Sequence, residues 1–124
     1  MSYDLWFWKQ KPDCVDQPGS IVTAIAQDGD YGSVCEIDMD SLLGAVILKF
    51  PAIEQHANPQ TGKLRQLILD PKDQDWMLLV GWPSHHLEVE SHGAPGEILN
   101  VFIDICWEYE CPLYDPQTGT RYTG

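Results

Sequence analysis

The segment from residue 85 to residue 92, HHLEVESH, gathers the side chains of this sequence that are best suited to chemistry. Imidazole and carboxylate groups bind transition metals and act as general acids and bases. On an extended strand, two apolar residues would face one way and a polar set the other: His86, Glu88, Glu90 and His92. Consecutive members of that set lie about 7 Å apart, too far to bind one ion without ligands from elsewhere. A solvated strand face over an apolar core therefore explains the pattern better than a metal site does.

Three acidic pairs also have the composition of cation ligands: Asp28 and Asp30, Asp38 and Asp40, and Asp73 and Asp75. None continues into the glycine and distal glutamate that a calcium-binding loop requires. Helix capping and turn formation account for them. The sequence also has no Gly-x-Ser-x-Gly motif and no glycine-rich phosphate loop. We therefore predict no catalytic residue, no metal site and no cofactor. The alternative is a small metal-dependent or hydrolytic enzyme that uses His85, His86 and His92.

The charge of the chain is its most unusual property. Nineteen Asp and Glu residues face seven Lys and Arg residues, which gives a net charge of −12 and an isoelectric point near 4.3. Such a surface repels nucleic acid and anionic membranes, because binding to either depends on cationic side chains. A basic protein is the partner that this charge would attract and steer. Plain solubility is the alternative explanation of the same charge.

Length and composition predict a single domain over residues 1–124. The chain is 44% hydrophobic and 21% charged, which is a globular rather than a disordered composition. Its opening segment, MSYDLWFWKQ, lacks the regions of a signal peptide, and no apolar run reaches transmembrane length. We therefore expect a cytoplasmic protein whose cysteines stay reduced: Cys14, Cys35, Cys106 and Cys111.

Hydrophobic periodicity predicts the elements that must position these residues. Apolar side chains on both faces of the segment 3–9 indicate an interior strand. Helical spacing and capping residues predict helices over 21–27, from Asp38 to Phe50, and from Pro95 onward. Alternating residues predict strands over 64–69, 76–82 and 85–91. The order predicts an α+β fold, with a mainly antiparallel sheet of four to five strands, two to three helices packed on one face, and a short C-terminal hairpin.

The tetrapeptide Pro-Gln-Thr-Gly occurs twice, after Asn58 and after Asp115. Proline presets the first turn residue, the preceding Asn or Asp accepts hydrogen bonds, and glycine supplies a left-handed conformation. We interpret both copies as turn chemistry rather than as a repeated site. The terminal copy has strand formers on both sides and predicts a hairpin, with Tyr114 facing and stacking on Arg121. The segment before Asn58 is poor in strand formers and predicts a loop.

The two ends of the chain carry a resemblance. MSYDLWFWKQ at the start, CPLYDPQTGTRY after the last predicted helix, and ILKFPAI between them look like segments of a group of small, acidic, uncharacterised bacterial cytosolic proteins. That group resembles the immunity proteins of polymorphic and contact-dependent toxin systems. The resemblance implies a binding protein that neutralises a cognate toxin domain made in the same cell, and it supplies no functional residues. Many such toxins are nucleases with basic clefts, which an acidic inhibitor can occlude.

Charge and resemblance together predict an immunity-type protein that binds a basic toxin domain, of which a nuclease is one kind. The partner contacts predicted from the acidic segments and one tryptophan are Asp70, Asp73, Asp75, Glu88, Glu90, Asp104, Trp107 and Glu108. Two alternatives stay open. One is the enzyme described above, and the other is a housekeeping adaptor or oligomer subunit that uses the aromatic first strand as its contact.

Overall fold

A computed structural model of the chain describes residues 2–14, 16–83 and 85–122. Within these ranges it has three helices and an eight-stranded antiparallel sheet, so the predicted α+β class is confirmed. The helices are α1 (Pro18–Asp28), α2 (Met39–Lys49) and α3 (Gly96–Glu108). The strands are β1 (Ser2–Gln10), β2 (Val34–Cys35), β3 (Glu54–Ala57), β4 (Leu64–Leu69), β5 (Met77–Gly81), β6 (His86–His92), β7 (Leu113–Asp115) and β8 (Thr120–Tyr122).

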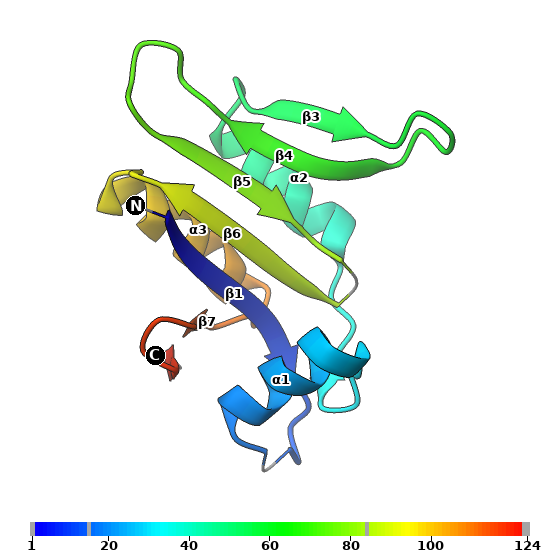
Figure 1. Ribbon diagram of the computed structural model, residues 1–124. Helices are drawn as coiled ribbons and strands as arrows, with labels where there is room; N and C mark the ends of the chain where they lie inside the picture. Colours follow the sequence, from blue (N-terminus) through cyan, green and yellow to red (C-terminus); the bar gives the residue numbers. More distant parts are fainter. Residues whose placement is uncertain (1, 15, 84, 123–124) are drawn as a thin grey trace.

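The strands follow the order β3-β4-β5-β6-β1-β7-β8, and β2 pairs with the end of β1. The first strand of the chain is therefore an interior strand, as its apolar composition predicts (Figure 1). The prediction of four to five strands was too low. The additional strands are short, and they depend on backbone pairing with a neighbour rather than on a long alternating pattern that sequence can reveal.

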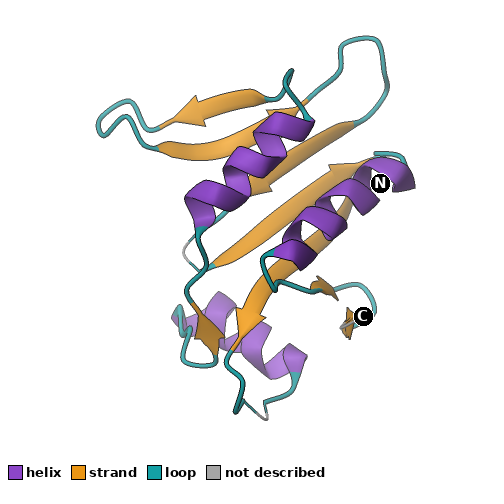
Figure 2. Cartoon of the chain, turned by 180° about the vertical axis from the view of Figure 1, so that it is seen from behind, coloured by secondary structure: helices purple, strands orange, loops and turns teal. Residues whose placement is uncertain are grey.

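The main core lies between the sheet and the helices α2 and α3, which cover the same face (Figure 2). Alternate strand residues point into it and pack against the apolar stripes of the two helices. The fully buried members of this core include Phe7, Leu42, Val46, Leu67, Leu78, Val80, Leu87 and Phe102.

Helix α1 lies on the opposite face of the sheet, at the end of β1 (Figures 1 and 2). There Ile21 and Ile25 pack with Trp8 and Tyr114 in a second, smaller core. The prediction that all helices pack on one face is therefore wrong for α1. The position of α1 follows from the apolar pattern of β1, which has large apolar side chains on both faces. Phe7 is buried in the main core, whereas Trp8 points to the other face and is buried there against α1. We call the rest of this face, which no helix covers, the open face.

The helix ends follow local chemistry. Asp38 caps α2 by accepting a hydrogen bond from the backbone N–H of Ser41 at 3.2 Å, which confirms the predicted cap. Gly29 ends α1 with φ of 62°, a left-handed conformation that glycine adopts without strain. Helix α1 begins at Pro18, three residues before the predicted start at residue 21, because proline is well suited to the first turn of a helix.

The two Pro-Gln-Thr-Gly segments form closely similar turns. The side chains of Asn58 and Asp115 each accept a hydrogen bond from the backbone N–H two residues later, at 2.8 and 2.9 Å. Gly62 and Gly119 have φ of 72° and 70°. Both segments connect hairpins, because Glu54–Ala57 pairs with β4 as an edge strand. The prediction of a loop before Asn58 was wrong, since a polar segment pairs readily at the edge of a sheet where its side chains stay exposed.

All four cysteines are free thiols, and Cys106 and Cys111 are buried. Among the described residues, no helix combines the length and the apolar character that crossing a bilayer would require.

Candidate functional site

The open face brings together side chains from four adjacent strands. The register places Trp6 of β1 opposite Glu88 of β6, Glu88 opposite Gly81 of β5, and Gly81 opposite Gln66 of β4. The next row places Asp4 opposite Glu90, and Glu90 opposite Leu79. Because neighbouring strands lie about 4.8 Å apart, these residues form one continuous patch.

A hollow of about 410 Å³ lies in this patch. Its lining includes two residues from each of three strands: Asp4 and Trp6, Leu79 and Gly81, Glu88 and Glu90. Gly81 has no side chain, and a Cβ atom built there would meet no heavy atom within 4 Å. A glycine in an interior strand thus leaves a gap between the side chains of the strands beside it.

Among the described residues, the carboxylates around the hollow form ion pairs with histidine only. Among the described residues, neither Lys nor Arg forms an ion pair with Asp4, Glu88 or Glu90. Two of these carboxylates lie beside histidines: His86 Nε2 is 3.6 Å from Glu88 Oε1, and His92 Nε2 is 3.3 Å from Glu90 Oε2. The open face therefore carries three carboxylates that no lysine or arginine of the described residues pairs with.

His86 is buried rather than solvated, which corrects the prediction of a wholly solvated histidine face. Its ring is 1% exposed and stacks on Trp6, with 4.4 Å between ring centroids and 25° between planes. Its Nδ1 shares a hydrogen bond of 2.8 Å with the Tyr31 hydroxyl, whose pKa is raised by burial and by Glu88. Its Nε2 makes no hydrogen bond and points toward Glu88. His86 therefore contacts both Trp6 and Glu88 on the open face.

The three histidines of the enzyme alternative do not converge. His86 begins β6 and His92 ends it, which separates them by about 20 Å of extended chain. His85 lies beside Tyr31 in an edge-on ring contact. No group of three or more His, Cys, Asp or Glu side chains within residues 2–14, 16–83 and 85–122 is placed to hold a metal ion.

The predicted loop acids lie at one end of the open face. Asp70 and Asp75 line a shallow hollow together with His92, which connects them to Glu90. Asp70 is partly neutralised, because Lys72 Nζ lies 2.8 Å from its Oδ2. Asp73 is exposed in the same loop.

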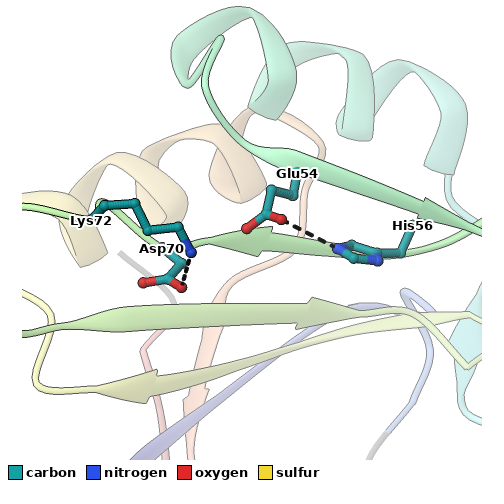
Figure 3. Close-up of polar contacts among 4 residues, drawn as sticks. All are labelled: Glu54, His56, Asp70 and Lys72. Carbon is teal, nitrogen blue, oxygen red and sulfur yellow. Dashed lines mark hydrogen bonds and ion pairs between the residues drawn. The ribbon is translucent and has the colours of Figure 1, made fainter.

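The edge strand β3 contributes its own polar pair. Figure 3 shows Glu54 and His56 projecting from β3, near the ion pair of Asp70 and Lys72. His56 Nε2 lies 3.9 Å from Glu54 Oε1, and both side chains are about half exposed.

The predicted contacts on α3 lie on the other side of the molecule. Asp104, Trp107 and Glu108 are exposed on this helix, which packs against the face of the sheet opposite the hollow (Figure 2). Trp107 is 47% exposed. The structure thus divides the eight predicted contacts into two surfaces, which a single small partner domain cannot cover together without wrapping around the sheet.

Sequence reasoning missed Asp4, Gly81 and Gln66 as site residues. The one signal in the sequence was Gly81 at the end of an apolar strand, because an isolated strand glycine marks a close approach or a gap. The aromatic face of the adaptor alternative is only partly available, since Trp8 is fully buried under α1 and Trp6 is half-buried.

The C-terminal hairpin fixes the strand that carries Asp4 and Trp6. The Gln117 side chain accepts a hydrogen bond of 2.8 Å from the backbone N–H of Asp4 and donates one of 3.0 Å to its carbonyl. The Tyr3 hydroxyl donates a hydrogen bond to the Asp115 carboxylate. We call this set of contacts the terminal clasp. It joins the two end segments on which the resemblance was based, so those segments have a structural reason to occur together.

The comparisons with known proteins give no match: no family model, no curated protein and no solved structure matches this chain.

Proposed function

We propose that this chain is an immunity-type protein that binds and neutralises a basic bacterial toxin domain through the open face of its sheet. The observation that carries the proposal is the group of carboxylates around a hollow on an uncovered sheet face: Asp4, Glu88 and Glu90 form no ion pair with a lysine or arginine of the described residues. The net charge of the chain, −12, has the same sign. The resemblance of the end segments to immunity proteins supports the assignment to this class of protein.

The physical basis is charge complementarity. A dense acidic surface raises the rate of encounter with a basic partner and disfavours acidic ones. A nuclease fits this surface well, because its cleft is built to attract the phosphate backbone. The paired strands fix the backbone positions of these acidic residues before binding, which reduces the entropy lost in the complex.

The test uses the toxin domain encoded beside the gene for this chain, titrated into the chain by calorimetry. Replacing two open-face acids, Glu88→Gln with Glu90→Gln, is expected to weaken binding by at least about tenfold. A matched variant that removes the same charge from α3, Asp104→Asn with Glu108→Gln, is expected to weaken binding by less than about threefold.

Two results would contradict parts of the proposal. An affinity that does not fall from low to moderate salt would remove the electrostatic basis of binding. A loss of affinity in the α3 variant but not in the open-face variant would keep the function and move the interface to the other surface. In cells, the chain should restore growth when the toxin domain is expressed, and the open-face variant should restore it less.

A further inference from the structure

The hollow on the open face combines chemical features that an acidic surface alone does not have. Gly81 provides empty space, Leu79 provides an apolar wall, and Trp6 provides an aromatic one. Carboxylates stand at its rim, among them Glu88 and Glu90. An occupant that matches these features has an apolar stem, a flat cationic end, and several hydrogen-bond donors.

Arginine has this combination. Its guanidinium carries five N–H donors in a plane and therefore can bridge two carboxylates that stand about 7 Å apart on one strand face. Glu88 and Glu90 have this relationship on β6. The same plane can lie against an indole ring, and Trp6 is the indole at this hollow. Gln66 adds an amide acceptor across the gap at Gly81.

A buried histidine contacts two of the residues that line the hollow. His86 is 1% exposed, stacks on Trp6, and directs its unbonded Nε2 at Glu88 from 3.6 Å. The Tyr31 hydroxyl fixes the ring by its 2.8 Å hydrogen bond to Nδ1. Stacking on this buried and hydrogen-bonded ring restricts the Trp6 indole before binding, which reduces the rearrangement that binding a cation requires.

Other small occupants fit less well. No group of three or more His, Cys, Asp or Glu side chains in the described part of the chain is placed to hold a metal ion. An anion would meet only acidic and neutral side chains. A lysine ammonium is a compact charge that cannot lie flat on an indole while bridging two carboxylates.

We propose that the hollow is a socket for one arginine side chain presented by a protein partner. This proposal depends on the proposed function in one respect only, namely that the arginine belongs to the toxin domain. The volume of about 410 Å³ is near the lower end of the range for ligand pockets, about 300–1,000 Å³, and suits one side chain.

The direct test is a titration of the isotope-labelled full chain with N-acetyl-arginine amide. Binding is followed by the amide resonance of Gly81 and the indole N–H resonance of Trp6. We expect saturable shifts of both, with a dissociation constant of about 1–10 mM. The citrulline analogue, which has the same shape and no charge, should not saturate. The lysine analogue should bind at least about threefold more weakly. Equal shifts with citrulline, or no saturation by roughly 100 mM arginine amide, would overturn the proposal.

The matched variants are Gly81→Val and Gly44→Val. The first fills the hollow without changing the charge, and its Cβ meets no heavy atom within 4 Å. The second adds the same side chain to α2 behind the sheet, also with no heavy atom within 4 Å of its Cβ. Gly81→Val should weaken arginine binding by at least about tenfold and Gly44→Val by less than about twofold. Glu88→Gln, which adds no bulk, should weaken it as well. Unchanged binding in Gly81→Val and in Glu88→Gln would place arginine elsewhere and overturn the socket.

Different experimental results would contradict the arginine socket and the proposed function. Arginine binding at Gly81 without any binding of the neighbouring toxin domain would keep the socket and remove the proposed function. Toxin binding that is lost with Glu88→Gln and Glu90→Gln but unchanged with Gly81→Val would keep the function and overturn the socket.

Discussion

Asp115 is predicted to stabilise the fold through the terminal clasp. The residue is 4% exposed, and its carboxylate accepts hydrogen bonds from the Tyr3 hydroxyl and from the side chain of Gln117. It also accepts one of 2.9 Å from the backbone N–H of Gln117. Burial by itself raises the pKa of Asp115, but these hydrogen bonds outweigh it and hold the pKa below its usual value.

The magnitude follows from what the replacement Asp115→Ala removes. A hydrogen bond to a charged group contributes about 1.5–3 kcal/mol, and Tyr3 is 38% exposed, so water can replace the carboxylate at its hydroxyl. The turn keeps the hydrogen bond from the Gly119 N–H to the carbonyl of residue 115 at 2.8 Å. We therefore expect Asp115→Ala to lower the free energy of unfolding by about 2–3 kcal/mol near neutral pH.

The effect must depend on pH with a definite sign. Because the folded pKa of Asp115 is depressed, its contribution is complete above the unfolded value of about 3.9 and is lost as the pH falls through the folded pKa. Urea unfolding of both proteins, followed between acidic and neutral pH, measures this difference. The variant Asp115→Asn keeps the shape of the side chain and serves as the control, with a smaller loss expected. A cost below about 0.5 kcal/mol, or a cost that does not shrink on acidification, would refute the role of the clasp.

Three further outcomes are expected. Gly119→Val and Gly62→Val, which place a β-branched residue at φ of 70° and 72°, should each lower stability by about 1 kcal/mol or more in urea unfolding, and unchanged midpoints would show that the turns do not matter. Burial raises the pKa of the Cys111 thiol to about 12, so alkylation at mildly alkaline pH should modify half-buried Cys14 first and spare Cys111 until unfolding, as mass spectrometry can show. Arg121→Met should lower the free energy of unfolding by about 1–2 kcal/mol, because the guanidinium lies 5.0 Å from the centre of the buried Trp8 indole and donates two hydrogen bonds. Equal stability of the two proteins in urea unfolding would argue against that contact.

The contact of Arg121 with Trp8 could not be predicted from the residues around Arg121 in the sequence. The register of the terminal hairpin, Tyr114 opposite Arg121, is confirmed. The guanidinium nevertheless lies over Trp8 of β1, more than a hundred residues earlier in the chain, rather than over the tyrosine that the hairpin suggested. The hairpin pattern is local, whereas the position of β1 beside β7 depends on the fold of the whole chain.

Much of the fold followed from local patterns. Alternation with a period of two identified β4, β5 and β6, and helical spacing with an aspartate cap identified α2. These predictions held because the residues that a strand or helix buries are determined by its own geometry. Missed elements such as β3 have little hydrophobic pattern, and only an adjacent strand makes them strands.

The sequence by itself determined the charge, the class of fold and the turn chemistry, because each depends on composition or on a few neighbouring residues. Only the tertiary structure decided which acidic residues share a surface. Asp4 and Glu90 meet because β1 pairs with β6, while Asp104 is carried to the other side of the sheet by α3. Strand order and register are set by the packing of the entire core, so no local pattern around Gly81 could reveal that its missing side chain opens a hollow among carboxylates.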